Sequence, residues 1–162
     1  MSMGDMAISA SYNPEPGVDG KEAETGLAFV YSGFDSVELS AGYFDDGDEA
    51  DNMTAGIKFT MGQMTAAYQM TEVNYSGTST KDQSASHYGV SIAVNDALSV
   101  SAAAQNVEFD NTAEDEKNSG FGASYTMGSI SMYGGFNKLE NVGGSATAGD
   151  VEASIFNISF AF

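Results

Sequence analysis

Positively charged residues are scarce in this chain of 162 residues. It contains five lysines, no arginine and one histidine, against 23 aspartates and glutamates, so its formal net charge is −18. A protein that binds nucleic acid through phosphate contacts needs a basic face. The chain cannot supply one, and nucleic acid is therefore excluded as a partner.

Cysteine is absent, which removes disulfides, thiolate metal ligands and cysteine nucleophiles together. Apolar residues make up 42% of the chain, yet no run of 18 of them occurs, so no transmembrane helix is predicted. The Gly-x-Ser-x-Gly, His-Glu-x-x-His and phosphate-loop motifs are also missing. We therefore predict that the protein is not an enzyme and requires no cofactor.

Large apolar residues alternate with small or polar ones along many segments, which is typical of strands with two unlike faces. In residues 52–61, for example, Met53, Ile57 and Phe59 fall on one face, and Thr54 and Lys58 on the other. Ten strands are predicted, at about 6–12, 25–32, 37–44, 52–61, 64–75, 85–94, 98–109, 119–127, 130–140 and 151–162. Glycine, with 19 copies, adds to the case against a helical fold.

The connections between these strands alternate in length. Short links containing Gly or Asn lie at 33–36, 62–63, 95–97 and 128–129, and long polar links lie at about 13–24, 45–51, 76–84, 110–118 and 141–150. Tight hairpins favour Gly and Asn because their turns need positive φ angles. The pattern predicts an antiparallel up-and-down β-barrel that spans a membrane, with turns at one edge and loops at the other.

The short turns form an internal repeat. Phe-Thr-Met-Gly-Gln-Met-Thr at 59–65 is nearly repeated as Tyr-Thr-Met-Gly-Ser-Ile-Ser at 125–131. Residues 2–9 give a third copy that has no predicted strand before it. Residues 1–25 also show no basic segment followed by an apolar one, so no signal peptide is predicted in the chain. Either a leader was removed or the chain is the C-terminal part of a longer barrel, and the isolated turn favours the second explanation.

The last predicted strand has the clearest pair of faces. Phe156, Ile158, Phe160 and Phe162 share one face, and Asn157, Ser159 and Ala161 share the other. An apolar row of this kind suits lipid on one side and a water-filled lumen on the other. The segment resembles the closing strand of bacterial outer-membrane barrels, and the resemblance implies that the four apolar residues form the C-terminal signal for barrel assembly.

The repeated Met-Gly turn, the strands rich in Gly, Ala, Ser and Tyr, the acidic loops and the Phe-Asn-Ile-Ser-Phe-Ala-Phe ending resemble Gram-negative general porins of the alphaproteobacterial, Rhodobacter-like type. The resemblance covers the whole chain, 1–162, as one barrel domain, and implies part of a sixteen-stranded barrel that forms homotrimers. It also implies an integral outer-membrane protein, in contact with lipid, that passes small hydrophilic solutes and ions by passive diffusion. The family's arginine cluster and long inward-folded loop have no counterpart in this sequence.

The alternation predicts which residues would line a lumen. The predicted pore-lining positions are Glu38, Lys58, Gln69, His87, Gln105, Asn137 and Asn157. Because acidic residues crowd the loops and basic residues are few in the strands, we expect the channel to prefer cations. His87 lacks the second His or Cys that a metal site or proton relay would need, so it is interpreted as a polar wall residue.

Aromatic residues near the predicted strand ends fit the girdles at a membrane interface. They are Tyr12, Tyr31, Tyr43, Phe59, Tyr75, Phe109 and Tyr125. Packing in the core of a soluble β fold is the other interpretation of these residues.

One acidic segment is a weak candidate for Ca²⁺. Asp45, Asp46 and Asp48 offer hard oxygen ligands, but their spacing does not match an EF-hand loop. A solvated loop explains the same residues.

Two other architectures remain open on the sequence. One is a soluble or secreted acidic β-sandwich that acts as a binding or adhesion module. The other is a complete ten-stranded barrel, since ten is an even number of strands.

Overall fold

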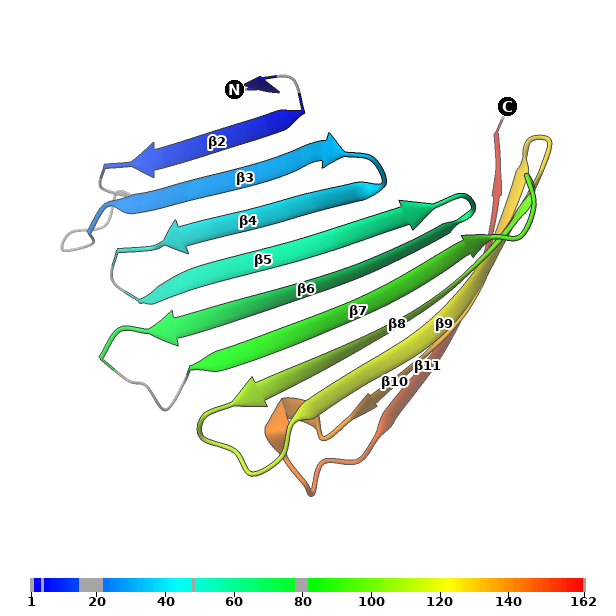
Figure 1. The fold of residues 1–162 in the computed structure, drawn as a ribbon. Helices are drawn as coiled ribbons and strands as arrows, with labels where there is room; N and C mark the ends of the chain where they lie inside the picture. The colour runs from blue at the N-terminus through cyan, green and yellow to red at the C-terminus, as the bar shows by residue number, and fades with distance from the viewer. Residues whose placement is uncertain (1, 4, 15–21, 48, 78–81, 162) are drawn as a thin grey trace.

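The computed structural model describes the whole chain except residues 1, 4, 15–21, 48, 78–81 and 162. The described residues form one antiparallel sheet in which strands follow one another in chain order (Figure 1). The strands are β1 (Ser2–Met3), β2 (Met6–Asn13), β3 (Glu24–Phe34), β4 (Val37–Asp45), β5 (Ala50–Met61), β6 (Met64–Tyr75), β7 (Gln83–Ala93), β8 (Leu98–Phe109), β9 (Glu116–Met127), β10 (Ile130–Glu140) and β11 (Val151–Phe160). Among the described residues no helix is long and apolar enough to cross a bilayer.

All ten predicted strands are confirmed, with ends that differ by a few residues. Two short elements were not predicted. The first is β1, which lies inside the turn copy at 2–9 and pairs with β2 through Met3 and Met6. The second is a 3-10 turn, η2 (Val142–Gly144), in the loop before β11. Both are too short to produce a hydrophobic period.

The sheet is a single layer whose two faces are both open. Among the described residues only Ala50, Val107, Gly122 and Gly144 are buried, and only the first two of these carry a side chain. Large side chains such as Phe156 and Phe121 remain 71% and 65% exposed. A β-sandwich would cover one face of the sheet with a second sheet. The described residues contain no such second layer, and the sandwich interpretation is therefore wrong for them.

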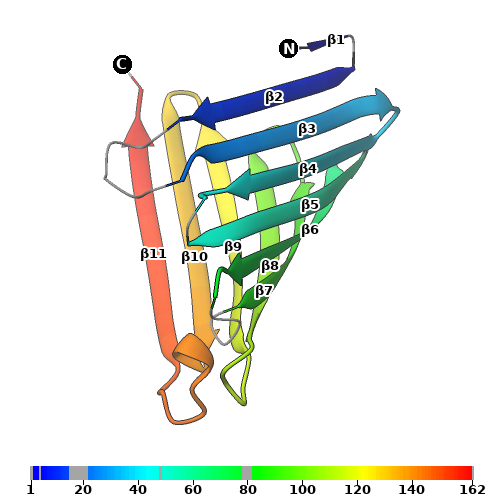
Figure 2. The same ribbon diagram turned by 90° about the vertical axis from the view of Figure 1, so that its left-hand side faces the viewer.

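The sheet curls into a trough that does not close. Figure 2 shows β2 and β11 at its two edges, running at a steep angle to each other. Within the described residues β11 pairs only with β10, and β2 pairs with β3 and the short β1. The coiling follows from the right-handed twist of each strand, which accumulates across a wide sheet. The described strands therefore do not form a complete ten-stranded barrel.

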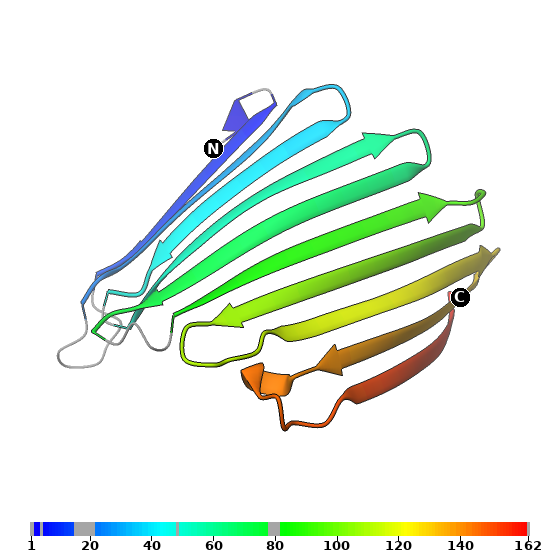
Figure 3. The ribbon, with the colours of Figure 1, turned by 60° about the horizontal axis from the view of Figure 1, so that its bottom comes forward.

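Turns and loops are sorted to opposite edges, as the link lengths predicted (Figure 3). Gly62 and Gly128 adopt positive φ angles of 57° and 60°, as expected. In the hairpin of β3 and β4 the residue with the positive φ angle is Ser36 instead of Gly33, because β3 continues to Phe34. At Asn95 the side chain makes the turn, since its Oδ1 accepts hydrogen bonds from the N–H groups of Ala97 and Leu98, both at 2.9 Å.

At the loop edge, the loop between β10 and β11 is hydrogen-bonded to the end of the loop between β8 and β9. The backbone N–H of Gly143 donates to Oε2 of Glu116 at 2.8 Å, and Nδ2 of Asn141 donates to the carbonyl of Asp115 at 3.1 Å. Asp115 also accepts a hydrogen bond from Nδ2 of Asn106 at 3.1 Å. Part of the acidic charge therefore holds the loops in place.

Candidate channel wall

Cross-strand partners in an antiparallel sheet point to the same face, so the register assigns each residue to a face. One continuous row of partners is Glu38, Lys58, Ala67, Gly89, Ala103, Gly120, Asn137 and Ala153. Gln69, His87, Gln105 and Asn157 lie an even number of positions along their strands from members of this row. The register therefore places all seven predicted pore-lining residues on one face, named here the inner face.

The opposite, outer face carries most of the large apolar side chains. On β11 it presents Phe156, Ile158 and Phe160, which pair with Gly134, Met132 and Ile130 of β10. Phe156 and Phe160 are 71% and 59% exposed. Phe162, the fourth predicted member of this row, lies outside the described residues. A row of exposed aromatic groups on a folded sheet requires an apolar surrounding.

The apolar part of the outer face is a band with a sharp boundary. On β5 it runs from Met61 at the turn edge to Met53, and Asp51 follows. Nine residues of a strand tilted by about 45° span roughly 20 Å, close to the apolar band of about 25 Å in transmembrane barrels. Beyond the band the outer face becomes polar at the loop edge, through Asp45, Asp51, Glu72, Lys117, Lys138 and Glu152.

The aromatic residues predicted for the girdles do not all share this face. The register puts Tyr12, Tyr31, Tyr43, Phe59 and Tyr125 on the outer face. Tyr75 pairs with Ala50, and Phe109 pairs with Gln83, so both belong to the inner face and the prediction for them is wrong. They share the loop end of the inner face with Ala50 and Val107, which are both buried. Apolar packing beneath the loops explains their position there.

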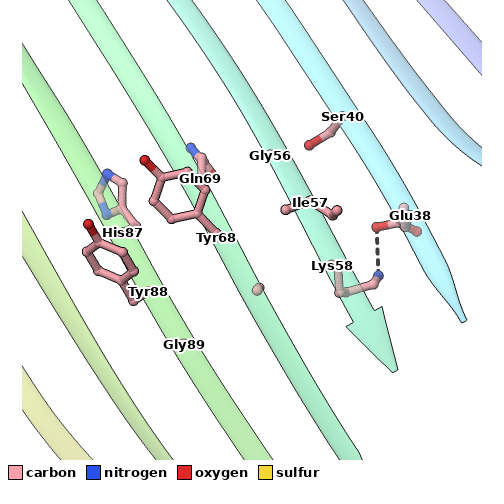
Figure 4. A pocket seen from close by; sticks show the side chains of 11 residues that line it. Glu38, Ser40, Gly56, Ile57, Lys58, Tyr68, Gln69, His87, Tyr88 and Gly89 are labelled. Carbon is pink, nitrogen blue, oxygen red and sulfur yellow. Dashed lines mark hydrogen bonds and ion pairs between the residues drawn. The ribbon is translucent and has the colours of Figure 1, made fainter. Parts of the chain in front are cut away.

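Among the residues that the structure describes, the inner face has one ion pair away from the loop edge. Nζ of Lys58 on β5 donates to Oε1 of Glu38 on β4 at 2.6 Å, with both side chains well exposed (Figure 4). The pair borders a cleft of about 360 Å³ that reaches Gln69 and His87 on the next two strands. Gly56, Ala67 and Gly89 give this cleft an open floor. Exposed pairs of this kind add little stability, about 0–1 kcal/mol.

A second cleft adjoins the first and shares His87 with it. Its polar lining is His87, Gln105, Asn118 and Asn137, and its volume is about 170 Å³. Sequence reasoning missed Asn118, because β9 begins at Glu116 and not at 119 as predicted. The side chains across from His87 are the amides of Gln69 and Gln105. His87 therefore lies in a row of hydrogen-bonding groups.

The candidate Ca²⁺ segment uses its carboxylates to shape the loop. Oδ1 of Asp45 accepts from the N–H of Gly47 at 2.7 Å, and Oδ1 of Asp46 accepts from the N–H groups of Glu49 and Ala50 at 2.7 and 2.8 Å. Asp48 lies outside the described residues. In the described part of the chain, no three acidic or histidine side chains gather as a metal site would require. The Asx-type hydrogen bonds favour the interpretation as a structured acidic loop.

A single-layer up-and-down sheet with an apolar outer face and a polar inner face has the architecture of a porin barrel wall. The family model for Gram-negative porins matches residues 1–144. The chain therefore belongs to the Gram-negative porin family. No curated protein matches the chain.

Solved porins share its fold at low sequence identity. A porin refined at 1.8 Å matches with a TM-score of 0.72 and 19% identity over 100% of this chain and 60% of its own. The anion-selective porin from Comamonas acidovorans matches with a TM-score of 0.73 and 14% identity, over 100% and 57%. Pseudomonas aeruginosa OpdO gives 0.74 and 12%, over 97% and 55%. The chain thus spans between half and two thirds of the length of these structures.

Proposed function

We propose that the protein is an outer-membrane channel for passive diffusion of small hydrophilic solutes and ions. The observation that carries the proposal is the pair of faces: an apolar band outside and a row of polar and small side chains inside. Passive diffusion needs a water-filled bore and no reactive group. The seven inner-face residues, from Glu38 to Asn157, are proposed as part of the pore lining.

We further propose that the described sheet is the C-terminal part of a sixteen-stranded barrel that assembles as a homotrimer. The open edges of β2 and β11 support this proposal, because an unpaired strand edge in lipid leaves backbone N–H and C=O groups without partners. The fraction of each solved porin that the chain covers, 55–60%, is close to ten strands of sixteen.

The channel is proposed to prefer cations, because acidic side chains crowd the loop edge while lysine is rare. The complete protein in a planar bilayer under a KCl gradient is expected to conduct, to close in three equal steps and to show a reversal potential of cation-selective sign. A protein that gives no conductance is not a channel. An anion-selective reversal potential contradicts the proposed cation preference and leaves the channel function standing. A single closing step contradicts the proposed trimer.

Two variants test how the ion pair of Lys58 and Glu38 affects ion selectivity in the same recording. Lys58→Gln leaves Glu38 unpaired and is expected to raise the cation-to-anion permeability ratio roughly 6-fold in dilute salt, because one charge at about 8 Å in water favours a cation and disfavours an anion by about 2.4-fold each. Glu38→Gln is expected to lower the ratio by a similar factor. Both shifts should shrink in 1 M salt, where the Debye length is about 3 Å.

Phe156, Ile158 and Phe160 on the outer face of β11, together with Phe162 further along the sequence, are proposed to act as the C-terminal assembly signal. Phe160→Ser is expected to reduce the heat-modifiable, folded fraction several-fold in cells while refolding into detergent micelles continues. Ser159→Ala, on the inner face of the same strand, is the matched control and should assemble normally. A Phe160→Ser protein that fails equally in micelles would show a loss of stability instead of a lost signal.

A further inference from the structure

We propose that the cleft formed by His87, Gln105, Asn118 and Asn137 binds a neutral polyhydroxylated solute of about the size of one sugar ring. The inference rests on the proposed channel function and specifies the class of solute that the wall retains. The first support is that the four polar side chains converge on one cleft. The four side chains come from four successive strands, β7 to β10, and line one cleft of about 170 Å³ on the inner face.

The second support is hydrogen-bonding capacity that the protein leaves unused. Within the described part of the chain, none of these four side chains has a hydrogen-bond partner. Some amides of the sheet do have partners, since Asn106 donates to Asp115 and Gln69 donates to Thr71. Among the described residues the amides of Asn52, Asn74, Gln83 and Asn157 have none, but these four do not line the cleft. Each amide group can both donate and accept, and so can each hydroxyl of a polyol. The cleft is therefore matched to a ligand rich in hydroxyl groups.

The third support is the absence of fixed charge in the lining. No carboxylate or ammonium group lines this cleft among the described residues. The ion pair of Lys58 and Glu38 lies in the adjoining cleft, where each charge is balanced by the other. A charged solute entering the cleft would lose water without gaining a counter-charge, which is unfavourable. This selects for neutral solutes.

The fourth support is the shape of the floor and of its border. Ala103 and Gly120 form the floor, and the side chain of Asn137 lies over Gly120, so the amide faces a ligand from the floor of the cleft. Along the strands toward the turn edge, the ring of Tyr133 lies over Gly122 and Gly135, with its Oη 2.9 and 2.7 Å from where their Cβ atoms would be. Tyr133 is 43% exposed, so part of its ring is accessible on the inner face. An aromatic face beside hydrogen-bonding groups suits the C–H face and the hydroxyl rim of a sugar.

The test is single-channel recording of the complete protein with D-glucose as the probe. Glucose is expected to reduce the current in a saturable way, beyond the reduction caused by glycerol at matched viscosity. Asn118→Ala and Gln105→Ala should each weaken the glucose effect about 2- to 10-fold, the cost of one lost hydrogen bond. Ser91→Ala, on the inner face of β7 outside the cleft, should bind glucose as the unmodified protein does.

Each result decides the proposal. If glucose and glycerol act alike while the protein conducts, or if Ser91→Ala weakens the glucose effect as much as the cleft variants do, the binding site is refuted and the channel function stands. If the unmodified protein does not conduct, both proposals fail. Heat-modifiable gel migration shows separately that each variant is folded.

Discussion

Replacing Val90 with lysine is expected to destabilise the folded protein by about 2–4 kcal/mol, the cost of a basic side chain near the bilayer midplane on the lipid face of a barrel. Val90 lies on the outer face of β7, midway along the apolar band between Tyr88 and Ile92. Its cross-strand partners are Ala66 and Ala102, neither of which can neutralise the added charge. Urea titration in lipid vesicles, followed by heat-modifiable migration, measures the change in the free energy of unfolding.

The neighbouring position provides the matched control. Ser91→Lys adds the same charge one residue further along β7, on the inner face, where water is expected to solvate it. Its effect on the free energy of unfolding should stay within about 0.5 kcal/mol. Equal costs at the two positions would mean that the two faces meet the same environment, and the assignment of lipid and lumen would be wrong.

Replacing Gly120 with alanine is expected to cost about 1–3 kcal/mol, because an added methyl group overpacks the site. A Cβ at Gly120 would lie 2.7 Å from the carbonyl oxygen of Phe136 and against Oδ1 of Asn137. The side chain of Asn137 can rotate away, whereas the backbone carbonyl of Phe136 belongs to the ladder between β9 and β10. The sheet itself must therefore shift, and the unfolding midpoint in urea should fall.

Gly89→Ala is the control for this substitution. Gly89 lies on the same face, and a Cβ there would meet no atom within 4 Å. Its replacement should leave stability unchanged or raise it by up to about 1 kcal/mol, because alanine reduces the freedom of the unfolded chain. A loss at Gly89 as large as that at Gly120 would show that the packing around Gly120 is not the cause.

The sequence predicted the fold well because a two-residue period was visible in most strands. Once Met53, Ile57 and Phe59 are placed on one face, every residue of β5 has its face assigned. The alternation of link lengths then orders the strands without any long-range information. Short elements escaped prediction because β1 and η2 contain too few residues to show a period.

The turns were predicted in position but only partly in mechanism. Gly62 and Gly128 have the positive φ that a tight hairpin needs. Ser36 takes that conformation at another turn, where the bulge between Tyr31 and Phe34 shifts the register by one position. Which residue adopts the positive φ angle depends on how the two strands align. Local composition does not encode this alignment.

The candidate site was harder to predict than the wall that carries it. Alternation assigned His87, Gln105 and Asn137 to one face, yet it could not show that they share a cleft with Asn118. That result requires the registers of β7 to β10, which are separated by turns and loops of different lengths. Tyr75 and Phe109 show the converse error, because residue type suggested a girdle where register gives an inner position.

Every long strand in this sheet pairs with the strands next to it in the chain. Contacts are therefore close in sequence, and hairpins can form one after another without threading the chain through earlier structure. The same arrangement allows a sheet to gain or lose whole hairpins without rearranging the others. The similar segments at 59–65 and 125–131, which share Thr-Met-Gly, are what repeated duplication of a hairpin unit would leave behind. The circumference of such a barrel can thus change in evolution by increments of two strands.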